Sequence, residues 1–325
     1  MSFHDNYSHF LLVFQWSNGT MQYMDIQENV SLKGKTTMRI GGTAKYYGEL
    51  ETKDDVAKAV ALAKEHSVPL ILLGGGSNTI FADGEINALV ARITADTVTI
   101  QKANEASEAN AATVTIQSGK NLPQLINELA QQGLDLSPLT GILGTVGGAI
   151  FGNAGQGPKG IWIDEYIESV EVYTDGQWKI LSKQDCNFHY RESLFKSQPL
   201  TPNPQPPIIW STTLRVPKKD PAEIKAEIER LLQKRIDTQP HVKTAGSCFK
   251  AVGDRPAWQL IDAAGLRDTT IGGVHISEKH ANFLINDGNA TFGDAVDVVQ
   301  TIKEGIPDAL DVEMRFVNED GSLEF

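Results

Sequence analysis

The sequence predicts an α+β fold of two or three domains. The chain has 325 residues, and one domain usually holds ~100–200. Segments with the three-and-four spacing of an amphipathic helix alternate with segments rich in Val, Ile and Thr, which are typical of strands. Glycine is abundant, with 29 residues, and gathers in two short segments. Such a chain can bury a substantial core and can also bring bare backbone close to a ligand.

The N-terminal third predicts a small α/β unit over residues 22–93. A helix over 53–66 is predicted by its apolar spacing, and Thr52 with Asp55 forms an N-terminal cap. The unit continues with a strand over 69–73, the first glycine segment over 74–78 and a β-rich piece over 88–93.

The middle of the chain, residues 94–220, predicts mostly strands. Its elements are strands within 97–117 around a polar hairpin (103–112), a helix over 122–132 that ends at Gly133, strands at 167–181 and 208–216, and a proline-rich connector at 199–207. The second glycine segment, 141–155, lies between them. Glycine loses much backbone entropy on folding, so this segment is predicted to be neither strand nor stable helix throughout.

The C-terminal region, residues 221–325, opens with a long predicted helix over 221–236. Its apolar face consists of Ile224, Ile228, Leu231 and Leu232. Further elements are helices at 256–264 and 291–304 and strands near 271–276, 281–285 and 311–317.

Composition excludes several classes of protein. A net charge of −12 argues against binding nucleic acid or anionic lipid through bulk electrostatics. Cys186 and Cys248 form neither a disulfide framework nor a zinc motif, so no metal is expected and a reducing cytoplasm fits best. The apolar stretch 10–14 is too short to span a membrane. Residues 1–21 are expected to be a tail, with Met21 or Met24 as an alternative start.

The two glycine segments favour a dinucleotide ligand. Around Ser77 and Asn78, inward-pointing backbone N–H groups could wrap a diphosphate, although a simple strand-to-loop turn is the alternative. The spacing is not G-x-G-x-x-G and no helix is predicted after it, so a Rossmann site is not indicated. Two such segments suggest an extended dinucleotide such as FAD held between two domains.

Three side chains are candidates for chemistry, each with an ordinary alternative. Arg191 could be a surface residue, but beside a flavin it would suit a substrate carboxylate. Ser247 could be a loop residue, and it lacks the G-x-S-x-G context of a hydrolase. Glu313 lies in an alternating strand, where a solvated position is the usual one.

Eight motifs follow one another along the chain: 37–42 (TMRIGG), 73–78 (LGGGSN), 141–148 (GILGTVGG), 153–155 (NAG), 190–193 (YRES), 245–247 (AGS), 275–286 (HISEKHANFLIN) and Glu313. In this order they resemble the UDP-N-acetylenolpyruvoylglucosamine reductase family over residues 36–321. The absence of an inserted tyrosine loop resembles the shorter, type II-like form.

The resemblance implies a three-part flavoprotein of the vanillyl-alcohol-oxidase-like type. FAD would be held non-covalently between residues 22–93 and 94–220, and the sugar nucleotide would be bound by 221–325, whose last strand could return to the flavin region. NADPH would reduce the flavin and leave. UDP-N-acetylglucosamine enolpyruvate would then receive a hydride and a proton and become UDP-N-acetylmuramate, a precursor of peptidoglycan. We expect a monomer.

The resemblance also implies roles for individual residues. Arg191 and Glu313 would stabilise the enolate formed at the substrate carboxylate, with Glu313 protonated, and Ser247 would donate the proton. The implied cofactor-binding residues are Arg39, Gly74, Gly75, Gly76, Ser77, Asn78, Gly141, Thr145, Val146, Gly147, Gly148 and Asn153. The implied substrate-binding residues are Tyr190, Lys250, His280 and Asn282.

Three positions depart from the family pattern: Leu143 replaces a proline, 156–160 (QGPKG) replaces Ala-Tyr-Gly, and Ala251 replaces Asn or Arg. None is a catalytic position. Two alternatives stay open at this point. One is another FAD-dependent oxidase or dehydrogenase of the same superfamily, and the other is an inactive flavin- or sugar-nucleotide-binding relative.

Overall fold

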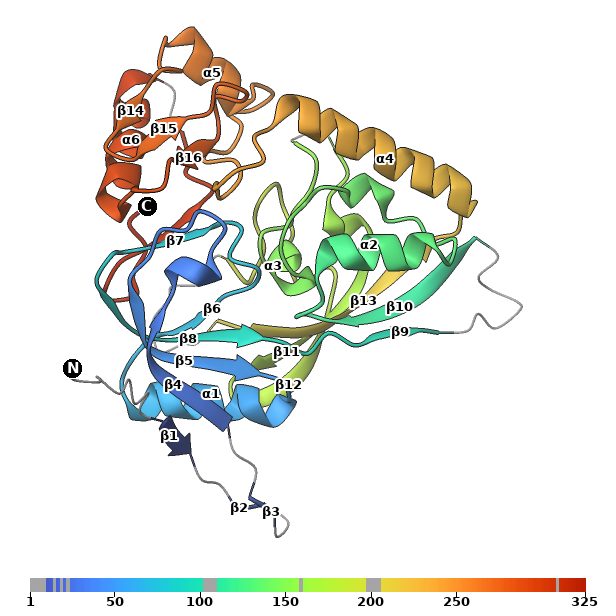
Figure 1. Ribbon diagram of the computed structural model, residues 1–325. Coiled ribbons are helices and arrows are strands. Elements are labelled where there is room, and N and C mark those ends of the chain that lie inside the picture. The colour runs from blue at the N-terminus through green and yellow to red at the C-terminus, as the bar shows by residue number, and fades with distance from the viewer. Residues whose placement is uncertain are drawn as a thin grey trace, which may run out of the picture.

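Each third of the chain builds its own sheet, and the three sheets lie around a common centre (Figure 1). The computed structural model describes residues 10–13, 16–17, 20–21, 24–101, 110–157, 160–196, 206–307 and 310–325. Within these ranges no helix is long and apolar enough to cross a membrane. Both cysteines are buried and free.

The first sheet has the strand order β1-β4-β5-β8-β6. Its strands are β1 (Phe10–Val13), β4 (Met24–Ser31), β5 (Thr43–Leu50), β8 (Glu85–Ile93) and β6 (Leu70–Leu72). The pairs β1/β4 and β4/β5 are antiparallel, whereas β8 runs parallel to both β5 and β6. Helix α1 (Lys53–Glu65) packs on this sheet and begins at the predicted cap: the Thr52 hydroxyl accepts from the Asp55 N–H, and the Asp55 carboxylate accepts from the Thr52 N–H.

The N-terminal residues differ from the predicted tail where they are described. Strand β1 pairs with β4 and so forms the outer edge of the first sheet, ahead of the predicted boundary at residue 22. The short strands β2 (Trp16–Ser17) and β3 (Thr20–Met21) pair with each other.

The second sheet is antiparallel, in the order β12-β11-β13-β10-β9. Its strands are β12 (Gln177–Ser182), β11 (Ile167–Thr174), β13 (Ile208–Pro217), β10 (Ala111–Gln117) and β9 (Val98–Ile100). Three helices share its core: α2 (Leu122–Ala130), α3 (Val146–Phe151) and α4 (Pro221–Thr238). Most of the predicted hairpin 103–112 and of the connector 199–207 lies outside the described residues.

Two predictions, one for the middle region and one for the first helix of the C-terminal region, are refined by the structure. The second glycine segment contains the short helix α3 between two loops. On α4, Ile224 and Ile228 are buried as expected, but Leu232 and Ile236 are 43% and 48% exposed because the second half of the helix leaves the core and lies along the cavity described below.

The C-terminal part combines a small antiparallel sheet with two helices. The sheet contains β14 (Thr270–Ile271), β15 (Val274–Ile276) and β16 (Leu284–Asn286), and the helices are α5 (Ala257–Ala263) and α6 (Phe292–Gly305). The last strand, β17 (Arg315–Val317), pairs in parallel with β7 (Thr79–Phe81). The chain end therefore returns to the first third, directly after the first glycine segment. Among the residues that the structure describes, three single turns of 3₁₀ helix complete the fold, at Lys33–Lys35, Ser137–Leu139 and Ile163–Glu165.

Candidate active site

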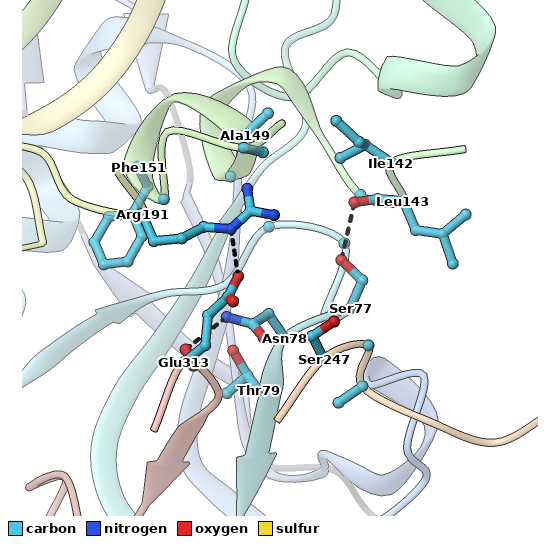
Figure 2. Close-up of a pocket in the computed structure, with 18 of the residues that line it drawn as sticks. Ser77, Asn78, Thr79, Ile142, Leu143, Ala149, Phe151, Arg191, Ser247 and Glu313 are labelled. Atoms are coloured by element: carbon cyan, nitrogen blue, oxygen red, sulfur yellow. Dashed lines mark hydrogen bonds and ion pairs between the residues drawn. The ribbon is translucent and has the colours of Figure 1, made fainter. Parts of the chain in front are cut away.

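A cavity of about 1030 Å³ lies where the three parts of the chain meet. Its wall combines the two glycine segments, the turn around Arg191, the end of α4, the loop around Ser247, and Glu313 with Arg315. Figure 2 shows Arg191, Glu313, Ser77, Asn78 and Ser247 facing the same space. The volume is at the upper end of the range for ligand pockets, so a large ligand fits.

The first glycine segment presents unused backbone donors to the cavity. The N–H groups from Gly74 to Asn78 donate to no described residue, although the same segment accepts hydrogen bonds at the Gly76 and Asn78 carbonyls from Thr37 and Arg315. Gly76 has a φ of +66°, which favours glycine. A run of free N–H groups around such a turn forms an anion-binding nest.

The glycines also allow the two segments to touch each other. A Cβ at Gly75 would lie 2.6 Å from the Gly144 Cα, which is backbone and cannot move aside cheaply. The Ser77 hydroxyl donates to the Leu143 carbonyl at 3.0 Å and fixes the contact. The sequence favours a ligand as the reason for these glycines, with a strand-to-loop turn as the alternative for 74–78. The structure adds that packing between the two segments also requires glycine at this contact.

The first N–H groups of helix α3 donate to other groups of the protein and are not free for a ligand. Val146 donates to the Lys120 carbonyl and Gly147 to the Ser118 carbonyl, each at 2.8 Å, while the Thr145 hydroxyl accepts from the Gly148 N–H. Thr145, Gly147 and Gly148 line the cavity, but Val146 is fully buried in the core.

Arg191 lies in a tight turn, residues 189–192, which we call the Arg191 turn. His189 and Glu192 exchange backbone hydrogen bonds at 3.1 Å, and Arg191 adopts a φ of +58°. Left-handed backbone at a non-glycine residue costs of order 1 kcal/mol and persists at functional sites. The strain turns the guanidinium into the cavity, where Nη2 donates to the Gly155 carbonyl at 2.8 Å.

Arg191 and Glu313 form an ion pair between two parts of the chain. The Arg191 Nε lies 3.0 Å from the Glu313 Oε1, and the two side chains are 15% and 16% exposed. The Nε–H is not aligned for a hydrogen bond, so the contact is purely ionic. Burial raises the pKa of Glu313, while the charges of Arg191, Lys196 and Lys250 oppose that rise.

Backbone contacts fix Glu313 beside Ser247. The Glu313 N–H donates to the Cys248 carbonyl at 2.7 Å, and its carbonyl accepts from the Asn78 side chain at 3.1 Å. The Ser247 hydroxyl faces the cavity and bonds to no described residue. Asn282 holds the same loop, because its side chain exchanges hydrogen bonds with the backbone of Phe249.

Most of the sequence-predicted site residues lie in the cavity wall. These are Gly74, Gly75, Gly76, Ser77, Asn78, Gly141, Thr145, Gly147, Gly148, Tyr190, Arg191, Ser247, His280, Asn282 and Glu313. The Tyr190 hydroxyl accepts from the Ala251 N–H at 3.3 Å, and burial lowers the pKa of His280.

Four predicted residues lie outside the cavity wall. Arg39 is exposed and donates to the Gly34 carbonyl. Val146 is buried, as noted above. Asn153 is also fully buried, and its amide donates to the His189 carbonyl at 2.9 Å, so it supports the Arg191 turn. Lys250 is paired with Glu192 instead. For these residues the geometry gives no direct contact with the space in which a ligand would lie.

Two arginines line the cavity and were missed by the sequence analysis. Arg235 on α4 lies against Gly141, where a Cβ would come within 2.2 Å of the Arg235 Cδ. Arg315 in β17 stacks on the Phe151 ring, with 5.0 Å between the guanidinium carbon and the ring centroid. Burial lowers the pKa of both, that of Arg315 to about 10.

Neither arginine has a carboxylate partner among the described residues, so each suits an anionic ligand. The available signal for Arg315 was its position two residues after Glu313 in the predicted strand 311–317, where alternate residues share a face. In the structure β17 begins only at Arg315. For Arg235 the only available signal was its place on the predicted helix, about one turn after the apolar residue Leu232. No group of three His, Cys, Asp or Glu side chains suited to a metal occurs in the part of the chain that the structure describes.

Comparison with known proteins identifies the family of this chain. Residues 239–316 match the family described as UDP-N-acetylenolpyruvoylglucosamine reductase, C-terminal domain, and residues 44–181 match an FAD binding domain. The UDP-N-acetylenolpyruvoylglucosamine reductase of Desulfosudis oleivorans is 34% identical over 284 residues, which cover 86% of this chain and 89% of that protein. The chain belongs to this reductase family.

Other members of the reductase family support the assignment. The enzyme of the same name from Chlamydia muridarum is 33% identical over 90% of this chain and 94% of its own length. The crystal structure of the Thermus caldophilus reductase superposes with a TM-score of 0.73 at 29% identity, covering 90% of this chain and 99% of that one. The predicted α+β flavoprotein fold is thereby confirmed, and neither alternative from the sequence analysis is favoured.

Proposed function

We propose that this chain reduces UDP-N-acetylglucosamine enolpyruvate to UDP-N-acetylmuramate with FAD as cofactor and NADPH as reductant. The observation that carries the proposal is the Arg191–Glu313 pair, which two distant segments bring together at the cavity, with Ser247 beside it. The product is a peptidoglycan precursor, so we assign the chain to cell-wall synthesis, and with it to cell shape and division. We further propose a cytoplasmic monomer without nucleic-acid or membrane partners.

The cavity has the features that FAD requires. The free N–H groups of the first glycine segment suit a diphosphate. Arg235 and Arg315, which have no carboxylate partner among the described residues, suit other negatively charged groups of the ligand. Packing of the two glycine segments leaves bare backbone for a close approach. When bound there, FAD would carry hydride from the nicotinamide to the vinyl carbon of the substrate.

The residues around Glu313 fit the second half of the reaction. Reduction of an enolpyruvyl ether builds negative charge on the substrate carboxylate, which the Arg191 guanidinium can stabilise. A protonated Glu313 can donate to the same group, and its raised pKa favours the protonated form. Ser247, with a hydroxyl that bonds to no described residue, is the proposed proton donor to the adjacent carbon.

The three sheets suggest which part of the chain binds the cofactor and which part binds the substrate. We propose that residues 22–93 and 94–220 bind the cofactor and that residues 221–325 bind the sugar nucleotide, with β17 returning to the cofactor side. Pairing of β17 with β7 supports this division because it places Glu313 and Arg315 next to the first glycine segment.

The visible spectrum tests the proposed function. We expect purified protein to be yellow, to bleach with NADPH without oxygen, and to recover its colour with the enolpyruvyl sugar nucleotide. A protein that binds FAD and bleaches but is not reoxidised by this substrate would overturn the assigned reaction. A protein that takes up no FAD would overturn the whole proposal.

A further inference from the structure

We propose that Glu192 is a positioning residue for the reaction: by bridging Lys196 and Lys250 it docks the loop that carries Ser247 onto the Arg191 turn. The inference rests on the proposed function and adds a residue to which no role has been given. Glu192 follows Arg191 directly, so its position in the sequence gives no hint of a contact with the C-terminal part.

Glu192 contacts two lysines from different parts of the chain. Its Oε1 accepts from the Lys250 Nζ in a close ion pair, and the Lys196 Nζ lies 3.6 Å from the same oxygen. The lysine side chains are only 16% and 19% exposed, and that of Glu192 is 35% exposed. Pairs shielded to this degree are screened less than surface pairs.

On one side, the bridge holds the Arg191 turn. The Lys196 Nζ donates to the Arg191 carbonyl at 3.0 Å, which fixes the peptide that follows the strained φ of +58°. Glu192 therefore stabilises, through Lys196, the backbone that directs the Arg191 guanidinium at Glu313. Without that support the turn can relax toward ordinary backbone angles.

On the other side, the bridge holds the two segments that carry Ser247 and Glu313. The Lys250 N–H donates to the Asp311 carbonyl at 2.9 Å, and the neighbouring Phe249 pairs with Val312 as an antiparallel bridge. The Cys248 carbonyl accepts from the Glu313 N–H in the same ladder. Lys250 is thus rigidly tied to Ser247 and Glu313, and the Glu192 carboxylate ties it to Arg191.

The bridge also sets the charge around Glu313. The charged and titratable groups that face Glu313 are Arg191, Glu192, Lys196, Lys250 and Cys248, and Arg315 follows two residues later, where β17 begins. Glu192 is the only carboxylate in this set of described residues, and it raises the pKa of Glu313 while the lysines lower it. Neutralising Glu192 therefore favours the ionised form of Glu313, which cannot donate a proton.

The main test compares E192Q with E192D and with a matched control, E171Q. Glu171 also forms an ion pair with a lysine from another part of the chain, Lys53, and lies outside the cavity. We expect E192Q to slow reoxidation by the enolpyruvyl substrate roughly 10- to 100-fold, because small displacements of reacting groups have effects of this size. Flavin content and reduction by NADPH should stay near the wild-type values, and E192D should restore part of the loss.

The pH profile of reoxidation adds a signature that a merely structural defect would not give. Since the pKa of Glu313 should fall in E192Q, the decline of the rate on the alkaline side should move to lower pH, and it should stay in place in E171Q. An unchanged rate and profile in E192Q, with an active wild-type protein, would overturn this inference alone. A wild-type protein that is not reoxidised would instead overturn the proposed function.

Thermal unfolding of the purified, FAD-loaded protein gives a measurement independent of catalysis. In a cycle of E192Q, K250M and the double variant, the two shifts of the melting temperature should be non-additive if the side chains act as a pair. Additive shifts would show that Glu192 does not couple the two parts, and would overturn the docking role even if E192Q lost activity.

Discussion

At the scale of single residues, the site depends on opposite charges brought out of water together. Arg191 and Glu313 are each largely buried, and a buried charge is tolerated only with a partner. The pair is not a simple stabilising contact, because burial still favours the protonated form of Glu313. In the proposed reaction, a substrate carboxylate would bind the Arg191 guanidinium and leave protonated Glu313 as a second hydrogen-bond donor.

Replacing Ser247 by alanine should separate the two half-reactions. Reduction of the flavin by NADPH needs only stacking and hydride transfer, so it should survive nearly unchanged. Reoxidation needs a proton at carbon, and general acid catalysis contributes ~10²–10⁴-fold, or ~3–5 kcal/mol of barrier. Rapid mixing measures both steps in S247A. Equal slowing of both would indicate a structural defect, and undiminished reoxidation would remove Ser247 from the mechanism.

Replacing Glu313 by glutamine should remove one pH dependence. Because the pKa of Glu313 is raised, the protonated donor is fully present at low pH and is lost as the pH rises through that pKa. The wild-type rate of reoxidation should therefore fall on the alkaline side. In E313Q the amide stays neutral and can still donate, so that decline should disappear while the rate at low pH drops. A decline at the same pH in E313Q would assign it to another group.

At the scale of elements, the two glycine segments act as one unit. The first follows β6, the second contains α3 between two loops, and they meet at Gly75 and Gly144 with no room for side chains. The same contact leaves the N–H groups of the first segment free for a ligand. Bare backbone therefore forms much of this wall of the cavity, together with side chains such as those of Ser77 and Asn78.

Gly75→Ala should damage this wall, whereas Gly152→Ala should not. The new Cβ at position 75 would collide with the Gly144 backbone, and overpacking typically costs ~1–3 kcal/mol of stability. At position 152 the nearest atom would be at an ordinary 3.8 Å. Chemical denaturation and FAD titration should show losses of both stability and affinity in G75A only. Equal behaviour of the two variants would contradict the packing argument.

At the scale of the whole molecule, the cavity is formed by all three parts at once. Thr37, from the first part, donates to the Thr244 carbonyl at 2.7 Å, and β17 returns to pair with β7. The Arg191–Glu313 and Glu192–Lys250 pairs join the middle and last parts. A ligand in this cavity therefore contacts every part and should stabilise the folded chain as a unit.

Added FAD should raise the melting temperature of the FAD-free protein. Binding to the native state alone contributes ~2.7 kcal/mol when free ligand is at 100 times its dissociation constant. The cofactor should be released into solution when the yellow protein is denatured, because the contacts expected in the cavity are non-covalent. Flavin that stays with precipitated protein, or a melting temperature independent of FAD, would show that the cavity holds it differently.

The sequence by itself determined many of the helices and strands and the candidate site residues. The cap at Thr52, the helix that ends before Gly133 and the strands of the second sheet follow from local rules of hydrogen bonding and side-chain spacing. Ser77, Arg191, Ser247 and Glu313 could be selected because motifs preserve the residue types that the chemistry needs. Each of these signals is contained in a short stretch of sequence, so one chain is enough to reveal it.

Only the tertiary structure decided which of these residues meet and what supports them. Arg235 and Arg315 look like ordinary residues of a helix and a strand until folding places them, without carboxylate partners, beside the cavity. Glu192 has its partner 58 positions away in Lys250. Such contacts depend on how separate parts pack, and burial then changes the charge preference of Glu313. Solvation and long-range pairing are properties of the assembled fold, and no local pattern in the sequence encodes them.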